Sequence, residues 1–202
     1  MNKYYQLVLA ATFTALTFPV VAEPISYRFA SVNYAKYSSI MNGFPADVDG
    51  YAISVDLSLD VTPYIAVTTG FSRGKADVTS AGTTSIADVE TVSLGVTIHL
   101  PINDRSDLVA TSSFVNGDVR VEGQFNESED INGGLTSIGV RSRISDYVEL
   151  DGFVHKNSIT DNSSISLSLS AGYYVNDRLS IDLGFALDSD GDTFMLGTTK
   201  YF

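Results

Sequence analysis

Apolar and polar residues alternate strictly, with a period of two, through several segments of this chain. In residues 51–60 every odd position is apolar, from Tyr51 to Leu59, and every even position is small or acidic. The same alternation recurs in residues 91–100 and 179–188. Successive side chains of a β-strand point to opposite faces, so this period predicts strands with one apolar face and excludes amphipathic helices. Each segment has about the ten residues that a tilted strand needs to cross the hydrocarbon layer of a membrane.

The first residues of the chain have the pattern of a secretory signal peptide. Met1-Asn-Lys3 precedes an apolar stretch from Leu7 to Val21, and the small residues at Val20 and Ala22 suit a signal peptidase. Cleavage is predicted after Ala22. The alternative is a retained membrane anchor, but the apolar stretch is shorter than the about 20 residues that a spanning helix needs. The domain prediction is therefore a signal peptide over residues 1–22 and one domain over residues 23–202.

The composition limits the classes of protein to which the chain can belong. It contains no Cys, so an exported form has no disulfide framework. The formal net charge of −12 argues against binding to nucleic acid and, by charge alone, to an anionic membrane surface. Beyond Ala22 no apolar run approaches the length of a spanning helix. A mature chain that crosses a membrane must therefore cross it with strands.

Short polar connections alternate with longer ones along the chain. The short ones lie at residues 60–64, 101–107, 145–147 and 176–178, and the longer ones at 39–49, 73–90, 116–134, 155–164 and 188–192. These connections predict ten strands, with eight as the alternative. The predicted strands are 25–38, 50–61, 63–74, 88–100, 107–122, 135–145, 147–157, 163–175, 178–188 and 192–202. An even number of strands puts both termini on the periplasmic side, so the longer loops face outward.

The end of the chain carries a further signal. The signal peptide, the ten-residue alternating strands, the alternating connections and the terminal Phe202 together resemble the small Gram-negative outer-membrane β-barrel proteins, in particular the OmpA-like and opacity-type group. Members of this group usually end in Gly-x-x-aromatic-x-Phe. Gly197 and Phe202 match this pattern, whereas Lys200 stands at the aromatic position and the aromatic residue is Tyr201.

This resemblance implies an all-β fold, a closed antiparallel up-and-down transmembrane β-barrel in the cell outer membrane. It also implies contact with outer-membrane lipid and lipopolysaccharide. The barrel-assembly machinery would read Gly197, Tyr201 and Phe202 as its signal. We expect a monomer without a cofactor. The alternative architecture is a water-soluble sandwich or lipocalin-like barrel, which would hide its apolar face inside.

In a membrane barrel the apolar face contacts lipid, so the polar face lines the lumen. The charged residues predicted to form a lumen ion-pair network are Arg141, Arg143, Glu149, Asp151, Asp56 and Asp182. The two arginines share one face of a strand and Glu149 and Asp151 follow on the next, which predicts a ladder of two ion pairs. Glycines such as Gly70, Gly95 and Gly139 make local space. The lumen is thus either a charge-paired plug or a narrow pore.

The chain gives little support to enzymatic activity. His155 shares its face with Asp151, but Ser158 lies three residues on and therefore on the opposite face of a strand. We predict no catalytic residue and no metal site, with a His155-based lipid-modifying enzyme as a remote alternative. The outer loops are predicted to be acidic, suited to divalent cations, a basic partner or plain solvation. The predicted function is therefore a non-enzymatic barrel that contributes to envelope integrity or surface interaction, and the alternative is a narrow pore for small solutes or ions.

Overall fold

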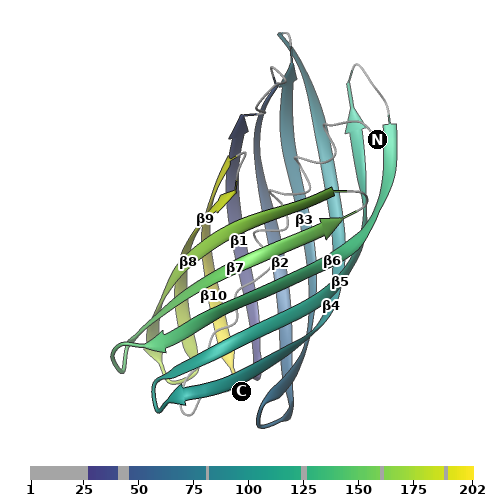
Figure 1. The fold of residues 1–202 in the computed structure, drawn as a ribbon. Coiled ribbons are helices and arrows are strands. Elements are labelled where there is room, and N and C mark those ends of the chain that lie inside the picture. Colours follow the sequence, from purple (N-terminus) through teal and green to yellow (C-terminus); the bar gives the residue numbers. More distant parts are fainter. Residues whose placement is uncertain (1–26, 41–45, 81, 124–126, 160–161, 189–190) are drawn as a thin grey trace.

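A computed structural model describes residues 27–40, 46–80, 82–123, 127–159, 162–188 and 191–202, and these form one closed antiparallel barrel of ten strands (Figure 1). The strands are β1 (Phe29–Ile40), β2 (Ala46–Thr62), β3 (Ile65–Ser80), β4 (Thr83–Asn103), β5 (Ser106–Glu122), β6 (Glu127–Arg143), β7 (Val148–Ile159), β8 (Asn162–Asn176), β9 (Leu179–Asp188) and β10 (Gly191–Tyr201). Each strand pairs with its neighbours in sequence, and β10 returns to pair with β1. The prediction of ten strands is confirmed, whereas the predicted signal peptide, residues 1–22, lies outside the described residues.

Closure of the barrel rests on one continuous ladder between the first and last strands. It runs from Phe29 opposite Tyr201 to Ser39 opposite Gly191 without a register shift. An open sheet would leave the backbone groups of these two strands unpaired, which is costly in a membrane. The described residues contain no helix that is long and apolar enough to cross a membrane.

The two ends of the barrel differ. We call the end with the connections 63–64, 104–105, 144–147 and 177–178, where β1 begins and β10 ends, the turn end, and the opposite end the rim end. At the turn end, side chains of the connections hold the backbone. The Asn103 Oδ1 atom accepts a hydrogen bond of 2.8 Å from the Arg105 N–H, and Asn176 Oδ1 accepts one of 2.9 Å from the Arg178 N–H. These are the local bonds that favour Asn in tight turns.

The strands run further toward the rim end than the sequence predicts. β3 continues to Ser80, and β4 begins at Thr83. Gly82 between them has a φ angle of 81°, which glycine adopts readily in a tight hairpin. The predicted long loops at 73–90, 116–134 and 155–164 are therefore wrong, since most of these residues are in strands.

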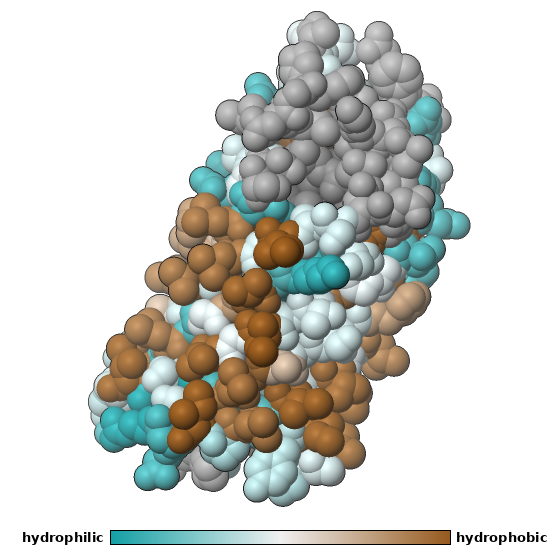
Figure 2. Space-filling model, viewed as in Figure 1, coloured by the Kyte–Doolittle hydropathy of each residue, from teal (hydrophilic) through white to brown (hydrophobic). Residues whose placement is uncertain are grey.

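A belt of apolar side chains covers the outside of the barrel toward the turn end. On β4 the outward residues from Val92 to Ile102 are all apolar and 44–61% exposed. At about 3.3 Å per residue and a tilt of about 40°, this stretch is roughly 25 Å high, the height of the apolar band of a membrane barrel. Figure 2 shows these apolar side chains gathered over the lower part of the barrel wall, with hydrophilic ones at the lower end and toward the upper edge.

The polarity of the two faces reverses near the rim. Along β4, outward Val92 is followed toward the rim by outward Glu90 and Asp88, while inward Ala87 and Val89 are fully buried. β3 shows the same reversal, since Phe71 faces outward whereas Ala76 and Val78 face inward. This reversal explains why the sequence pattern of these strand residues was interpreted as loops. Above a bilayer the outside of a barrel meets water, so alternation continues with polar residues outside and apolar residues inside.

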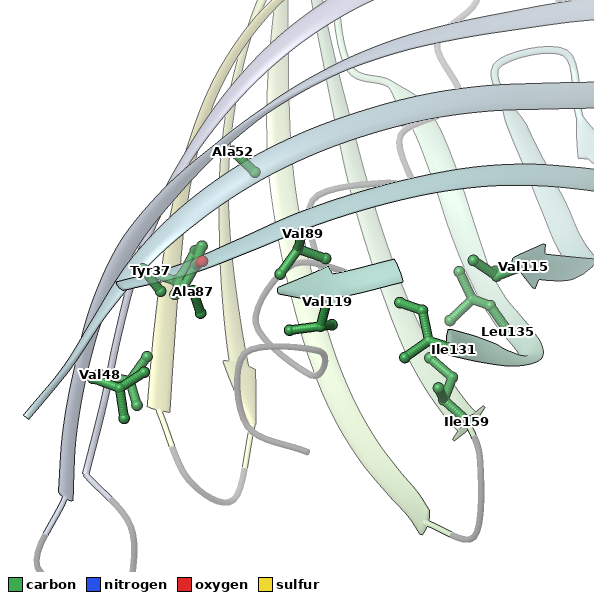
Figure 3. Close-up of a cluster of buried hydrophobic side chains, with 12 residues drawn as sticks. Tyr37, Val48, Ala52, Ala87, Val89, Val115, Val119, Ile131, Leu135 and Ile159 are labelled. Carbon is green, nitrogen blue, oxygen red and sulfur yellow. The ribbon is translucent and has the colours of Figure 1, made fainter. Parts of the chain in front are cut away.

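The inward apolar residues at the rim end form one cluster, which we call the rim apolar cluster. Its members are Tyr37, Val48, Ala52, Ala76, Val78, Ala87, Val89, Val115, Val119, Ile131, Leu135 and Ile159. They come from β1 to β7, and Figure 3 shows them on the inner wall of the barrel. The lumen is thus apolar at the rim end and polar toward the turn end.

Candidate functional site

Arg141 is the centre of the polar part of the lumen. Its side chain is 1% exposed, its Nε atom lies 3.2 Å from Asp151 Oδ1, and its Nη2 atom contacts Glu149 Oε1. The register explains this arrangement, because Arg141 pairs directly with Asp151 and Glu149 is two residues further along the same face of β7. One guanidinium therefore holds two carboxylates from the neighbouring strand.

Both carboxylates have a second partner on β8. The Tyr174 hydroxyl donates to Glu149 Oε2 at 3.0 Å, and the Ser170 hydroxyl donates to Asp151 Oδ2 at 3.1 Å. Buried carboxylates keep their charge at low cost only when such partners satisfy their remaining lone pairs. Three strands, β6, β7 and β8, are tied together by these contacts.

Further contacts carry this group across the lumen. The guanidinium carbon of Arg141 lies 5.6 Å from the centre of the Tyr27 ring. The Tyr27 ring stacks on His99 with 3.6 Å between the ring centres, and its hydroxyl donates to Asp107 Oδ2 at 3.2 Å. His99 Nδ1 is 3.6 Å from the same carboxylate oxygen. Residues that precede β1 and that lie on β4 to β8 thus meet near the turn end. We call this set the arginine cluster: Tyr27, His99, Asp107, Arg141, Glu149, Asp151, Ser170 and Tyr174.

The predicted ladder of two ion pairs is wrong for Arg143. It lies opposite Glu149 in the register, but the described residues show no ion pair between the two side chains. Its guanidinium instead lies 4.7 Å from the centre of the Tyr174 ring and donates to the backbone carbonyl of Asp146 at 3.2 Å. The reason is that Arg141 already contacts Glu149, and Arg143, the last residue of β6, reaches the connection that follows.

Asp56 was also predicted to belong to the ion-pair network. Its Oδ2 atom accepts hydrogen bonds from Asn33 at 3.0 Å, Ser54 at 3.3 Å and Ser31 at 3.4 Å. In the described part of the chain it has no Lys or Arg partner, because its neighbours across the register are Ser31 and Gly70. This carboxylate is therefore held by neutral donors.

Asp182 is held in the same way. It accepts hydrogen bonds of 2.8 Å from both Ser180 and Thr199. Its neighbours across the register are Gly172 and Gly197, which bring no cation to it. Asp56 and Asp182 thus face the lumen as predicted but, over the described residues, form no ion pair.

The space beside the lumen glycines Gly70, Gly95 and Gly139 is already filled. A Cβ atom on Gly70 would lie 2.8 Å from Ser93 Oγ, closer than real contacts allow, and one on Gly95 would meet Ser113. A Cβ atom on Gly139 would collide with the ring of Phe153. Neighbouring side chains therefore occupy the space that these glycines provide, which makes the interior close-packed there.

His155 lies inside the barrel wall rather than at an open surface. It is 1% exposed, and its Nε2 atom is 2.7 Å from the hydroxyl oxygen of Ser168, which is also 1% exposed. Ser158 lies on the opposite face of β7 and is exposed, so the structure does not bring it to His155. Within the described ranges no three His, Cys, Asp or Glu side chains are arranged to hold a metal ion.

The last strand presents its two terminal aromatic residues to opposite sides. Tyr201 faces inward, and its ring centre lies 5.8 Å from that of Tyr174 and 6.5 Å from that of Phe29. Phe202 is 64% exposed, and its N–H donates to the Arg28 carbonyl at 3.1 Å. The Lys200 ammonium lies 5.7 Å from the Phe202 ring centre. β10 thus ends with Tyr201 in the lumen, and Phe202, which follows it, lies on the outside.

Tyr27, Asp107 and Tyr174 are members of the cluster that the sequence did not identify. Tyr27 and Tyr174 fall in the predicted strands 25–38 and 163–175, and Asp107 ends the predicted short connection 101–107. Their contacts with one another and with Arg141 join residues far apart in sequence. The sequence offers one sign that Asp107 faces inward. It alternates with Leu108, which faces outward, and so lies on the same inner face as Val109.

Comparisons with known proteins identify the fold. No protein-family model matches the chain, and no curated protein matches it by sequence. Among solved structures, the transport unit of the autotransporter AIDA-I from Escherichia coli is similar with a TM-score of 0.59 and 10% identity, over 98% of this chain and 97% of that one. The translocator domain of the autotransporter NalP from Neisseria meningitidis has a TM-score of 0.55 and 9% identity, over 99% and 95%. An outer membrane channel from Pseudomonas putida F1 has a TM-score of 0.50 and 10% identity, over 90% and 97%. The chain therefore has the fold of the outer-membrane β-barrel proteins.

Proposed function

We propose that this protein is a non-enzymatic integral outer-membrane β-barrel whose lumen is closed at the turn end, and that it contributes to envelope integrity or surface interaction. The observation that carries the proposal is the arginine cluster. It links the residues before β1 with β4 to β8 through buried contacts centred on Arg141. A buried cation with two carboxylates and their hydroxyl partners is costly to separate, so it favours a rigid plug over an open channel.

The orientation and partners follow from the same architecture. Because β1 begins and β10 ends at the turn end, this end faces the periplasm and the rim end faces outward. Residues 1–22 direct export and are removed, the barrel-assembly machinery reads Gly197, Tyr201 and Phe202, and the apolar belt contacts membrane lipid and lipopolysaccharide. The barrel acts as a monomer. His155 serves as a hydrogen-bonded wall residue and not as a catalytic base, because both it and Ser168 are buried in the wall.

The acidic outer surface supports a role in surface interaction. The acids predicted to lie in loops are mostly on the rim-end parts of strands, where some form ion pairs: Arg73 with Glu90 at 3.2 Å, Lys75 with Asp88 at 3.1 Å and Arg120 with Asp118 at 2.9 Å. Asp49 and Asp77 stand opposite each other on β2 and β3. Like charges placed in this way repel each other, and a bound cation or a basic partner would reduce this repulsion. Cations and basic partners are the two classes of partner that we propose.

A narrow pore is the second candidate function. Asp56 and Asp182 face the lumen and, among the described residues, have only neutral hydrogen-bond donors. Two uncompensated carboxylates on a path for ions attract cations and exclude anions. If the lumen conducts, the protein is therefore a cation-selective pore.

Planar-bilayer recording distinguishes the two functions. We expect the wild-type protein to give no discrete conductance steps, because the Tyr27 ring lies against Arg141 and the Tyr174 hydroxyl donates a hydrogen bond to Glu149 at the centre of the plug. The double variant Tyr27→Ser, Tyr174→Ser removes both rings and is expected to open small, cation-selective steps. Tyr64→Ser, which alters an exposed ring at the turn end, is the control and stays silent. Stable discrete channels of the wild-type protein would contradict the plug and support the pore.

A further inference from the structure

We propose that the part of β6 beyond the end of β7 is a docking edge for an extended basic peptide segment of a partner protein, which pairs with it as an added strand. This inference deepens the proposed role in surface interaction and rests on it. β6 pairs with β5 from Ser142 to Glu127, but its pairing with β7 stops where Gly133 meets Ile159. Figure 1 shows β6 rising past the end of β7. Among the described residues, positions 128–132 therefore have a strand on one side only, and we call them the open edge.

The alternation of the ladder identifies the backbone groups that point to the open side. The N–H of Arg143, the last residue of β6, donates to the carbonyl of Arg105 at the start of β5, and the register between the two strands has no shift. The residues of an antiparallel strand bond alternately to one neighbouring strand and to the other. The odd-numbered residues of β6 thus bond to β5, whereas Ser128 and Asp130 direct their N–H and C=O groups to the open side. Backbone groups in this position are a template for one more strand.

The open edge lies on the water side of the reversal of polarity. Asp130 stands opposite Asp118 on β5, which in turn stands opposite Glu90 on β4, the first acid beyond the apolar belt. Ser128 and Asp130 are exposed on the outer face. An unpaired edge is costly inside a bilayer but not in water, so it is tolerated only at this height. At about 3.4 Å per residue the open edge is about 17 Å long, enough for a short peptide.

The charges of the open edge select a basic partner. Asp130 is exposed and Glu129 is half-buried, and over the described ranges neither side chain forms an ion pair. Asp118 across the ladder is already held by Arg120 at 2.9 Å. A second copy of this chain would bring a second set of acids to the same edge, and like charges opposite each other on paired strands are destabilising. A segment with Lys or Arg at alternate positions instead offsets these charges and is attracted to them.

Three peptides separate backbone pairing from charge attraction. The first has about eight residues that alternate Lys with Thr, a residue that favours strands. The second has the same side chains but a methyl group on every backbone amide, and the third has Glu in place of Lys. With the whole barrel in lipid nanodiscs, titration of the labelled peptides is expected to give at least about tenfold weaker binding of the methylated peptide and no binding of the Glu peptide. Amide hydrogen exchange at Ser128 and Asp130 is expected to slow with the first peptide alone.

Two matched pairs of variants place the binding at the open edge. Ser128→Pro removes one edge N–H without a change of charge, and proline is accepted on an edge strand. It is expected to weaken binding of the first peptide at least about fivefold, whereas Ser128→Ala leaves it unchanged. Asp130→Asn is expected to weaken binding about threefold. Asp77→Asn removes an exposed acid from β3, which has a strand on both sides there, and is expected to change binding less than about twofold. Heat-modifiable gel mobility shows that each variant is folded.

The outcomes distinguish strand addition from a general attraction to the acidic surface. Equal binding of the methylated and unmethylated peptides, or equal losses for Asp130→Asn and Asp77→Asn, would overturn the docking edge and leave the proposed surface interaction with basic partners in place. Absence of binding by the first peptide would overturn both the docking edge and the basic partner. The bilayer recording described above tests the plug independently of either result.

Discussion

Arg141→Met is expected to lower the free energy of unfolding by about 3–5 kcal/mol, because it leaves two buried carboxylates without their cation. Glu149 and Asp151 keep only the hydroxyl donors Tyr174 and Ser170 after the substitution. Methionine preserves much of the volume of the side chain, so the loss reports on charge more than on packing. Urea unfolding in lipid vesicles measures the effect by circular dichroism, since the chain has no Trp for fluorescence.

Two further variants show whether the loss comes from the unpaired charges. Adding Glu149→Gln and Asp151→Asn to Arg141→Met removes the orphaned carboxylates and is expected to recover most of the stability. Arg120→Met breaks the ion pair with Asp118, in which the arginine side chain is 64% exposed, and is expected to cost less than about 1 kcal/mol. Equal losses for Arg141→Met and Arg120→Met would show that the arginine cluster does not hold the lumen together.

Val96→Arg is expected to destabilise the barrel by about 2–4 kcal/mol, the cost of a cation at the middle of the bilayer on the lipid-facing side of a barrel. Val96 is 44% exposed near the centre of the belt on β4. Ile86→Arg makes the same change on the same strand and the same face, where Ile86 is 46% exposed beyond the reversal of polarity. Its expected cost is between about 0 and 1 kcal/mol, because the new charge meets water there.

The difference between these two arginine variants is the measurement, again by urea unfolding in vesicles. The two native side chains have nearly equal exposure, so a difference reports on the surrounding solvent and not on burial in the protein. Similar costs at both positions would mean that the bilayer does not end between Glu90 and Val92.

The number of strands and the direction of each belt residue were predictable from the sequence, because a membrane strand must alternate over its whole length. Val92, Leu94 and Val96 illustrate this, since their odd neighbours are all small or polar. The rim-end strands were not predictable in the same way. Around Asp88 and Glu90 the alternation continues with the opposite polarity, and charged residues interrupt the apolar face as they do in loops. Only the pairing with β3 and β5 distinguishes these residues from a loop.

Contacts in the polar lumen were predictable between residues on neighbouring strands. Contacts between residues that meet only because the barrel closes were not predictable. Arg141, Glu149 and Asp151 lie on consecutive strands joined by a short connection, so their proximity follows from the order of the chain. Tyr27 precedes β1 and Asp107 lies on β5, and the sequence alone does not reveal the curvature of the barrel that brings them to the cluster. The partner of Arg143 could not be predicted either. Arg141 and Arg143 compete for Glu149, and the outcome depends on the positions of individual atoms.

One boundary on β4 fixes the position of the barrel in the membrane: the apolar belt ends at Val92 and the water-exposed rim begins at Glu90. The chain contains no Cys, so single substitutions introduce one thiol each. With Ile86→Cys, Asp88→Cys, Val96→Cys and Ile98→Cys expressed in intact Gram-negative cells, a membrane-impermeant maleimide reports which positions meet the external water. We expect rapid labelling at positions 86 and 88 and protection at 96 and 98. Equal labelling at all four positions, or labelling at 96 and 98 alone, would contradict the transmembrane belt and its outward-facing rim.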